Sequence, residues 1–433
     1  MPFPQNEPLN TLTSGLRSGQ IPLLDYLDHL QEQFNAYEPK VQAFVPEEIR
    51  FARLKEEAAQ LFDRYPQPSE RPLFFGLPIG VKDIFNVDGF TTRAGTLLDS
   101  SLIQGPESAA ITKMKEAGAL ILGKTVTTEF AYFAPGPTRN PQNLEHTPGG
   151  SSSGSAAAVA AGLCPLAFGT QTIGSINRPA AFCGVVGYKP NYDRISREGV
   201  IPVSPSADHV GFFVQYASDA PLVAHLLCKE WRPVTARRKP ALGIPDGPYL
   251  AHASQEALHH FEATCRLMQE AGFPVKRVPI MTDFDKIYER HNQIVAAEAA
   301  RTHENWYPQY SALYHPKTAE LIERGRQIDQ KTLQEALQGQ KILRDQLHET
   351  MTQYGLHLWL SPSAVGPAPK GLQSTGDPVM NLPWTHAGLP TITLPAGTSS
   401  NGLPLGLQVT ARWYHDEELL AWAPQLEQVL IPM

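Results

Sequence analysis

The hydroxyl groups most suited to nucleophilic chemistry lie in a Gly- and Ser-rich stretch between Thr138 and Ser155 that has almost no apolar residue. Within it, GSSSG fits the G-x-S-x-G elbow that would make Ser152 the nucleophile of an α/β-hydrolase. That elbow requires a strand directly before the serine, whereas the preceding residues, NPQNLEHTPG, are polar and contain proline. The context therefore disfavours an α/β-hydrolase elbow at Ser152.

A second pattern, GALILGKT at residues 118–125, satisfies the G-x-x-x-x-G-K-[ST] signature of a phosphate-binding loop. Such a loop follows a strand, wraps flexible backbone around phosphate and opens a helix. Here a helical segment, ITKMKEAG, comes first, and the variable positions Ala-Leu-Ile-Leu are typical of a strand. We therefore interpret these residues as a buried strand rather than a nucleotide site.

Segment by segment, the chain resembles the amidase signature family, whose members share a Gly/Ser-rich core and a Lys–cis-Ser–Ser triad. The resemblance covers most of the chain and includes LPIGVKDIF, GALILGKTVTTEF, NPQNLEHTPGGSSSGSAAAVAAG, GTQTIGSINRPAAFCGVVGYKP, PWTHAGLPTITLPAG and LPLGLQVTAR. The long Gly/Ser core is its most specific part. The resemblance implies an amidohydrolase with the α/β fold of that family, a mixed central β-sheet flanked by helices with a helical cap segment.

The resemblance assigns the acyl-forming nucleophile to Ser175. The neighbouring residues suit that role, because Gly174 lets a substrate approach the backbone closely. In addition, the backbone N–H groups of Thr172, Ile173, Gly174 and Ser175 can converge on a carbonyl oxygen and form an oxyanion hole. Each donor directed at a tetrahedral oxyanion typically contributes about 3–4 kcal/mol to catalysis.

The same resemblance implies that Ser151 relays a proton between Ser175 and Lys82, and that the Gly150–Ser151 peptide bond is cis. For that relay Lys82 must be neutral, although an exposed lysine has a pKa of about 10.4. Burial in an otherwise apolar strand would lower this pKa, and strand alternation would direct Asp83 to the opposite face. A surface lysine at a strand end is the ordinary alternative.

Family members usually read G-T-D-T-G-G-S-I-R around the nucleophile, whereas this chain reads GTQTIGSIN. Gln171 and Asn177 therefore replace a charged pair, and two neutral amides can still hydrogen-bond to each other. Ile173 replaces a Gly, so the backbone must avoid glycine-only angles and the side chain is expected to narrow the pocket. Arg178, one residue further along, is a candidate to supply the positive charge that Asn177 lacks. For Ser152 two roles stay open: a hydroxyl that supports the triad, or a polar residue that satisfies loop backbone.

Hydrophobic periodicity predicts the elements that must position these residues. Apolar residues at helical spacing predict amphipathic helices near the N-terminus, and short apolar runs divided by Gly and Pro then predict α/β alternation. The charged segment from Asp283 to Tyr354 is expected to form the cap. Because we find no repeat or low-complexity linker, we expect a single amidase domain over residues 1–433. Its predicted parts are N-terminal helices (1–70), a signature core (71–215), a second α/β part with the helical cap (216–354), and C-terminal strands with a helix (355–433).

The composition is that of a folded globular protein, since 42% of the 433 residues are hydrophobic and 18% are charged. A formal net charge of −7 gives no overall basic field, so no nucleic-acid partner is expected. No apolar run is long enough for a membrane span, and the first residues do not form a secretory signal. The four cysteines have neither zinc nor disulfide spacing, so we expect reduced thiols in a cytoplasmic protein.

The sequence thus predicts a cytoplasmic amidase, without metal or cofactor, that acts on a small-molecule amide. It would release a carboxylate and ammonia or an amine through an acyl-enzyme on Ser175. Two alternatives stay open, namely the amidase subunit of a glutamyl/aspartyl-tRNA amidotransferase-like complex and a non-catalytic binding protein on the same fold. A homodimeric state is also left open. The acyl group and the leaving amine do not follow from the sequence.

Overall fold

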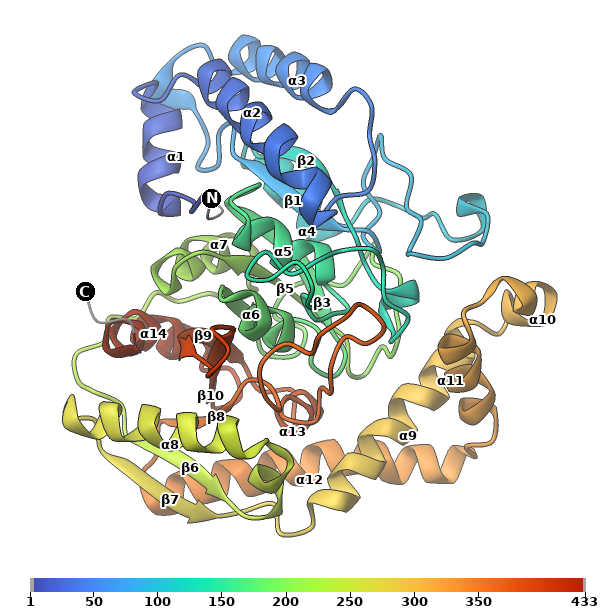
Figure 1. The fold of residues 1–433 in the computed structure, drawn as a ribbon, viewed down its shortest axis with the longest axis vertical. Coiled ribbons are helices and arrows are strands. Elements are labelled where there is room, and N and C mark those ends of the chain that lie inside the picture. Colours follow the sequence, from blue (N-terminus) through green and yellow to red (C-terminus); the bar gives the residue numbers. More distant parts are fainter. Residues whose placement is uncertain (1–3, 431–433) are drawn as a thin grey trace.

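The protein is built around one mixed sheet that runs through the molecule (Figure 1). The computed structural model describes residues 4–430. Their strands are β1 (Pro78–Lys82), β2 (Leu120–Thr125), β3 (Leu166–Gln171), β4 (Val186–Lys189), β5 (His209–Val214), β6 (Leu242–Asp246), β7 (Val275–Pro279), β8 (Leu358–Pro362), β9 (Thr391–Thr398) and β10 (Pro404–Ala411). These ten strands lie in the order β2-β1-β3-β5-β4-β9-β10-β8-β6-β7.

Strand pairing differs between the ends and the middle of the sheet. At one end β1 pairs in parallel with β2 and β3, and at the other β6 pairs in parallel with β7 and β8. The strands between them pair antiparallel. All residues of β1 to β5 are buried, as expected of strands that are covered on both faces. The predicted mixed sheet flanked by helices is therefore confirmed.

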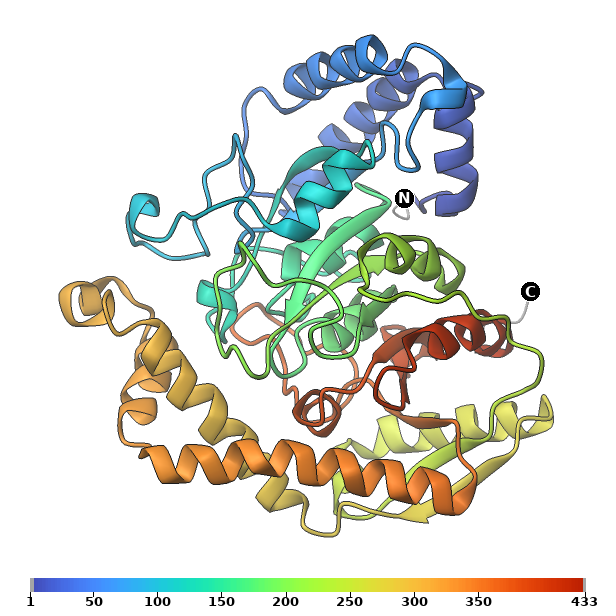
Figure 2. The same ribbon diagram turned by 180° about the vertical axis from the view of Figure 1, so that it is seen from behind.

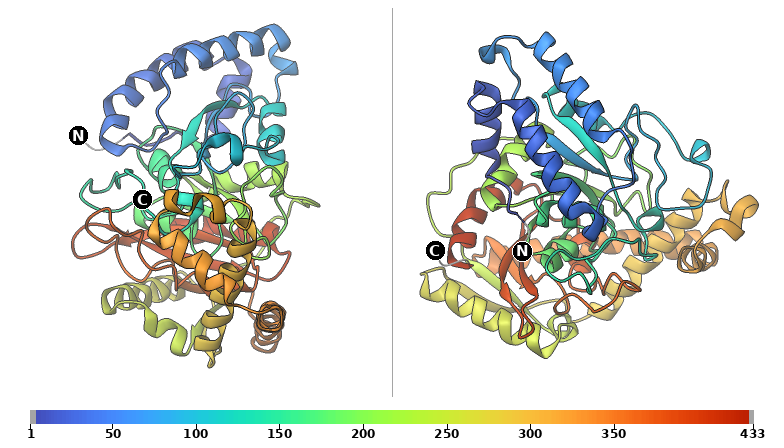
Figure 3. Two further views of the ribbon diagram at one scale, coloured as in Figure 1. Left: turned by 90° about the vertical axis from the view of Figure 1, so that its right-hand side faces the viewer. Right: turned by 45° about the horizontal axis from the view of Figure 1, so that its top comes forward.

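The predicted N-terminal helices are α1 (Leu9–Ser18), α2 (Leu23–Val41) and α3 (Arg50–Arg64). They cover the β2 end of the sheet, at the top of Figure 1, with α3 packed directly against β2. The apolar positions that suggested helical spacing face inward, since Leu27 and Leu54 are fully buried. Figure 3 shows that α2 and α3 lie at the opposite end of the molecule from the helix α8 (Gln255–Glu270).

Small residues allow the helix after the Gly/Ser run to pack closely inside the molecule. This helix, α5 (Ser153–Ala160), contacts β1, β3 and β5 and the helix α6 (Asn177–Cys183). A Cβ atom added at Gly154 would lie 2.1 Å from the backbone oxygen of Ala43, a distance that no side chain can tolerate. The remaining helices around the sheet are α4 (Ala109–Glu116), α7 (Ala220–Leu227), α13 (Leu382–His386) and α14 (Asp416–Leu430).

The charged segment predicted as a cap is helical. It forms α9 (Phe284–Thr302), α10 (Tyr307–Tyr310), α11 (Pro316–Arg326) and α12 (Gln330–Tyr354), and Figure 2 shows α12 crossing below the core. Its attachment to the core is aromatic and polar: the Phe130 ring stacks on Tyr314 with centroids 5.5 Å apart, and the Glu129 carboxylate accepts a hydrogen bond from the backbone N–H of His315. Within residues 4–430 neither α12 nor any other helix is long and apolar enough to cross a membrane.

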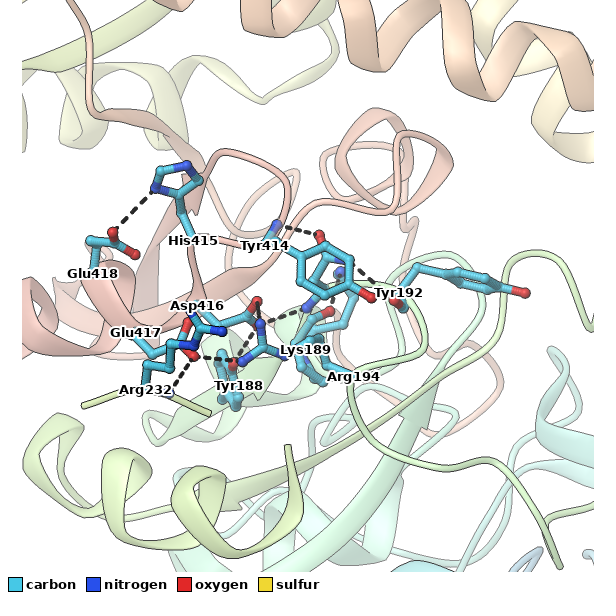
Figure 4. Close-up of polar contacts among 12 residues, drawn as sticks. Tyr188, Lys189, Tyr192, Arg194, Arg232, Tyr414, His415, Asp416, Glu417 and Glu418 are labelled. Carbon is cyan, nitrogen blue, oxygen red and sulfur yellow. Dashed lines mark hydrogen bonds and ion pairs between the residues drawn. The ribbon is translucent and has the colours of Figure 1, made fainter. Parts of the chain in front are cut away.

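A buried polar cluster fixes the closing helix to the centre of the sheet. Figure 4 shows the side chains of Tyr188 and Arg194 pointing toward Asp416 and Glu417, which begin α14. The Tyr188 hydroxyl donates to Asp416 Oδ1 at 2.6 Å, and the backbone N–H of Asn191 donates to the same oxygen at 2.8 Å. Arg194 Nη2 donates to Glu417 Oε1 at 2.7 Å. Burial raises the pKa of Asp416. The hydrogen bonds from Tyr188 and Asn191 act against this shift, because they stabilise the ionised carboxylate.

We predict that Asp416→Ala destabilises the protein by about 3–5 kcal/mol, because removal of one member of a buried charged cluster leaves its partners unpaired. The measurement is the free energy of unfolding in urea. Asp345→Ala is the matched control, since Asp345 pairs with Lys341 on the exposed surface of α12 and should change stability by less than about 0.5 kcal/mol. Equal unfolding midpoints for the two variants would contradict the role of the cluster.

Candidate active site

The structure places two of the three residues predicted as a triad on the wall of one cavity, and the third in contact with one of them. Ser151 and Ser175 both line this cavity, whose empty volume is about 320 Å³. Lys82 lies behind Ser151, with its Nζ atom 2.7 Å from Ser151 Oγ. Lys82 is fully buried, whereas Ser175 is 8% exposed. Lys82 and Ser151 are thus joined by a hydrogen bond, whereas within residues 4–430 Ser175 shares the cavity wall with Ser151 without a hydrogen bond between the two hydroxyls.

Lys82 ends strand β1, where the neighbouring strand β3 supplies a second hydroxyl contact. Its Nζ atom donates to Thr170 Oγ1 at 2.8 Å as well as to Ser151. Burial lowers the pKa of Lys82 well below its usual range, and the negative charge of Asp208 opposes that shift. The alternative of a surface lysine is therefore wrong.

Asp83 is the first residue after strand β1, and its carboxylate contacts another lysine rather than Lys82. Its carboxylate pairs with Lys124 Nζ at 2.7 Å, and both side chains are buried. Lys124 is the lysine of the GKT pattern, and it also donates to Thr92 Oγ1 at 3.1 Å. Because these residues form strand β2 and this lysine is occupied by Asp83, the interpretation as a buried strand is confirmed.

The loop before α5 presents Ser151 to the cavity. The Gly150–Ser151 peptide bond is cis, as the family resemblance implied. Gly150 has no side chain, and a Cβ there would lie 2.8 Å from Thr375 Cγ2. Its carbonyl accepts a hydrogen bond from Arg178 Nη2 at 2.6 Å, while the Ser151 carbonyl accepts one from the backbone N–H of Thr128 at 3.2 Å. The backbone on both sides of this bond is therefore held by other segments.

Ser152 is fully buried, and its hydroxyl is used by strand β3. It donates to the Thr170 carbonyl at 3.1 Å and accepts from the Thr170 backbone N–H at 3.3 Å. Of the two roles left open for Ser152, the backbone role is the one observed. This role also serves the site, since the Thr170 side chain contacts Lys82.

The two neutral amides beside Ser175 form the hydrogen bond expected from the sequence. Gln171 Nε2 donates to Asn177 Oδ1 at 2.8 Å. Gln171 Oε1 in turn accepts from the backbone N–H groups of Ile176 and Asn177, at 2.8 and 2.9 Å. The Gln171 side chain thus closes the turn that carries Ser175 from β3 into α6.

The four backbone N–H groups predicted to form the oxyanion hole lie on this turn. Within residues 4–430 no acceptor pairs with the N–H groups of Thr172, Ile173, Gly174 or Ser175, and all four residues line the cavity. Ile173 is not among the described residues with positive φ, so its side chain causes no left-handed strain. A Cβ at Gly174 would lie 2.3 Å from Asn381 Oδ1, which explains why glycine precedes the nucleophile candidate.

Three residues that sequence reasoning missed hold the same turn from behind. His291 Nε2 donates to the Thr172 carbonyl at 3.1 Å, and Thr385 Oγ1 donates to the Ile173 carbonyl at 2.7 Å. Asp208 Oδ1 accepts from Thr172 Oγ1 at 2.6 Å. Burial lowers the pKa of His291 to about 4, so this imidazole is neutral at physiological pH. Thr385 lies in the PWTHAGLPTITLPAG segment of the family resemblance, but no motif marks His291 or Asp208, and the fold brings the three together from α9, α13 and the segment before β5.

The cap lines the approach to the cavity. A larger space, with an empty volume of about 1260 Å³, shares Tyr132, Phe133 and Ile173 with the inner cavity. Tyr288 of α9 and Arg324 of α11 lie on its wall. Ile173 therefore lies where the two spaces meet, and its narrowing of the pocket stays a prediction. Residues 4–430 contain no group of three or more His, Cys, Asp or Glu side chains placed to hold a metal ion.

Comparison with known proteins finds a matching family and similar solved structures. Residues 25–420 match the family described as Amidase. A glutamyl-tRNA(Gln) amidotransferase subunit from Synechococcus sp. (strain RCC307) is 30% identical, and the match covers 97% of each chain. A crystal structure of an amidase superposes with a TM-score of 0.90 at 30% identity, over 98% of this chain and 100% of the other. The structure of a glutamyl-tRNA(Gln) amidotransferase subunit from Thermotoga maritima gives a TM-score of 0.74 at 26% identity, over 93% and 90%.

With the match spanning nearly the whole chain, and the Gly/Ser core placed beside a buried lysine, the chain belongs to the amidase signature family.

Proposed function

We propose that the protein is an amidohydrolase that cleaves a carboxylic amide C–N bond through a covalent acyl-enzyme on Ser175. The observation that carries this proposal is the 2.7 Å contact between Lys82 Nζ and Ser151 Oγ, directly behind the cavity that Ser175 lines. Family membership supports the class of reaction. The small cavity supports a small-molecule amide as the substrate.

In the proposed first step Ser175 Oγ attacks the amide carbon. Its proton passes to Ser151 Oγ, and the Ser151 proton passes to the lone pair of neutral Lys82. The carbonyl electron pair moves onto oxygen, where the unpaired N–H groups of residues 172–175 stabilise the negative charge. Collapse of this intermediate breaks the C–N bond, and the leaving nitrogen takes the proton back through Ser151. Water then hydrolyses the ester by the same proton path in reverse, which regenerates Ser175 and releases the carboxylate.

The environment of Lys82 suits it to act as the base. A buried amine is neutral at a lower pH than an exposed one, and the hydrogen bonds to Ser151 and Thr170 fix its position. The Asp208 carboxylate lies close enough to raise the Lys82 pKa, so it also stabilises the ammonium formed during the reaction. Burial raises the pKa of Asp208 to about 6, which leaves Asp208 ionised above neutral pH.

A second candidate function follows from the relatives named as glutamyl-tRNA(Gln) amidotransferase subunits, which are 27–30% identical to this chain. In that case the same chemistry would supply ammonia within a multi-subunit enzyme rather than act alone. Purification of the tagged protein from its native host distinguishes the two. Stoichiometric partner subunits would support the complex, and turnover of free amides by the isolated chain would support the stand-alone amidase.

The proposed nucleophile can be tested with a fluorophosphonate probe and a panel of primary and aryl amides. We expect the wild-type protein to hydrolyse at least one amide and to carry the label on Ser175, as located by peptide mass spectrometry. Ser175→Ala should lose labelling and lower kcat by at least about 1000-fold. Lys82→Ala should lose comparable activity, whereas Ser14→Ala, at an exposed position of α1, should match the wild type. Equal turnover by wild type and Lys82→Ala would support the non-catalytic alternative.

The pH dependence of kcat/KM tests Lys82 as the base. Activity should rise with pH as Lys82 loses its proton, with a midpoint below the ordinary lysine value of about 10.4. Since the Asp208 charge raises the Lys82 pKa, Asp208→Asn should move that midpoint to lower pH when measured above pH 7.

Asp345→Asn is the control for this measurement, because it removes the charge of an exposed carboxylate on α12. It should leave both the rate and the midpoint unchanged. A midpoint that is unchanged in Asp208→Asn, or equally shifted in both variants, would rule out the assignment of the ascending limb to Lys82.

A further inference from the structure

Arg178 places an incompletely satisfied positive charge on the wall of the proposed active site. It follows Ser175 by one turn, and its backbone N–H donates to the Gly174 carbonyl at 3.0 Å. The side chain is 2% exposed and lines the same cavity as Ser151 and Ser175. Arg178 therefore shares the wall of this cavity with the nucleophile candidate.

The hydrogen bonds of Arg178 use only part of its guanidinium. Nη2 donates to the Gly150 carbonyl at 2.6 Å and to Thr375 Oγ1 at 3.2 Å. Nε and Nη1 are buried and have no acceptor within residues 4–430. A buried charged donor without an acceptor costs free energy, and guanidinium groups pair most favourably with carboxylates. The contacts with Gly150 and Thr375 therefore account for only one of the three guanidinium nitrogens of Arg178.

No acidic side chain neutralises Arg178 inside the cavity. Among the described residues, those that line this space include no Asp or Glu, and Phe133, Val203 and Val295 contribute apolar walls. Asp377 is the acidic group whose charge acts on Arg178, but it lies in the outer space and its Oδ1 accepts from the Val379 backbone N–H at 2.9 Å. Burial lowers the pKa of Arg178 to about 10, so the group is still charged at neutral pH.

We propose that Arg178 binds a carboxylate on the acyl part of the substrate, so that the protein acts on monoamides of short dicarboxylic acids. This inference rests on the proposed amidase function and names its substrate class. The second carboxylate would accept hydrogen bonds from the free donors of Arg178 while the amide carbon lies at Ser175. Because Arg178 follows Ser175 by only three residues, and both line one small cavity, only a short chain fits between the two groups.

The test compares pairs of substrates that differ only in charge. Monoamides of dicarboxylic acids with one, two or three methylene groups are each assayed beside the diamide of the same acid. We expect kcat/KM to be at least about 100-fold higher for one monoamide than for its diamide. Arg178→Gln should abolish this ratio, and Arg178→Lys should retain part of it. Arg326→Gln, which removes an exposed cation of α11, should leave the ratio unchanged.

A binding measurement separates carboxylate recognition from the chemical step, since Arg178 also holds the Gly150 carbonyl. Calorimetry with the dicarboxylate product should detect binding to Ser175→Ala and at least about tenfold weaker binding to Ser175→Ala/Arg178→Gln. Hydrolysis of both substrates of a pair at equal rates by the wild type would overturn the carboxylate site and leave the amidase proposal standing. Arg178-dependent binding without hydrolysis of any amide would support the carboxylate site and contradict the amidase proposal. A loss of activity in Arg178→Gln that leaves the monoamide-to-diamide ratio intact would overturn the inference.

Discussion

The proposed chemistry depends on a lysine that is buried without a carboxylate in hydrogen-bonding contact. Lys82 Nζ meets two hydroxyl groups, those of Ser151 and Thr170, while the adjacent Asp83 pairs with Lys124. An ammonium paired directly with Asp83 would stay protonated and could not accept a proton. The end of β1 therefore separates the Asp83–Lys124 ion pair from an amine available for proton transfer. The Asp208 charge acts on Lys82 without a hydrogen bond and raises the Lys82 pKa. It therefore opposes the larger effect of burial, which lowers that pKa.

The turn that carries Ser175 shows how neutral groups can replace a charged brace. Gln171 accepts from two backbone N–H groups and donates to Asn177, which fixes the turn while leaving the four preceding N–H groups without acceptors. His291 and Thr385 bind the carbonyls on the reverse side, so those N–H groups are directed toward the cavity. Arg178, next to Asn177, contacts the Gly150 carbonyl through Nη2 and keeps Nε and Nη1 buried without an acceptor in the described part of the chain.

Much of this arrangement followed from local sequence. The Gly/Ser run, the strand around Lys82 and the Gln171–Asn177 hydrogen bond were predictable, because each depends on residues close together in the chain or on the family pattern. The supports from His291, Asp208 and Thr385 were not predictable, since they depend on how α9, α13 and the loop before β5 pack around the sheet. The wall of the outer space was missed for the same reason. A charged surface helix and a helix that lines a substrate passage carry similar sequence patterns, and only the packing of α9 and α11 separates them.

The central claim, that Lys82 is a neutral amine in the resting protein, is most directly tested by titrating its side chain. Nitrogen-15 NMR of protein labelled at lysine Nζ would follow the resonance, assigned as the one missing from Lys82→Met. We expect a Lys82 pKa well below the ordinary value of 10.4, because the amine is fully buried. A Lys82 pKa near 10.4 would contradict the claim, since the residue would then be protonated at neutral pH and unable to accept the Ser151 proton.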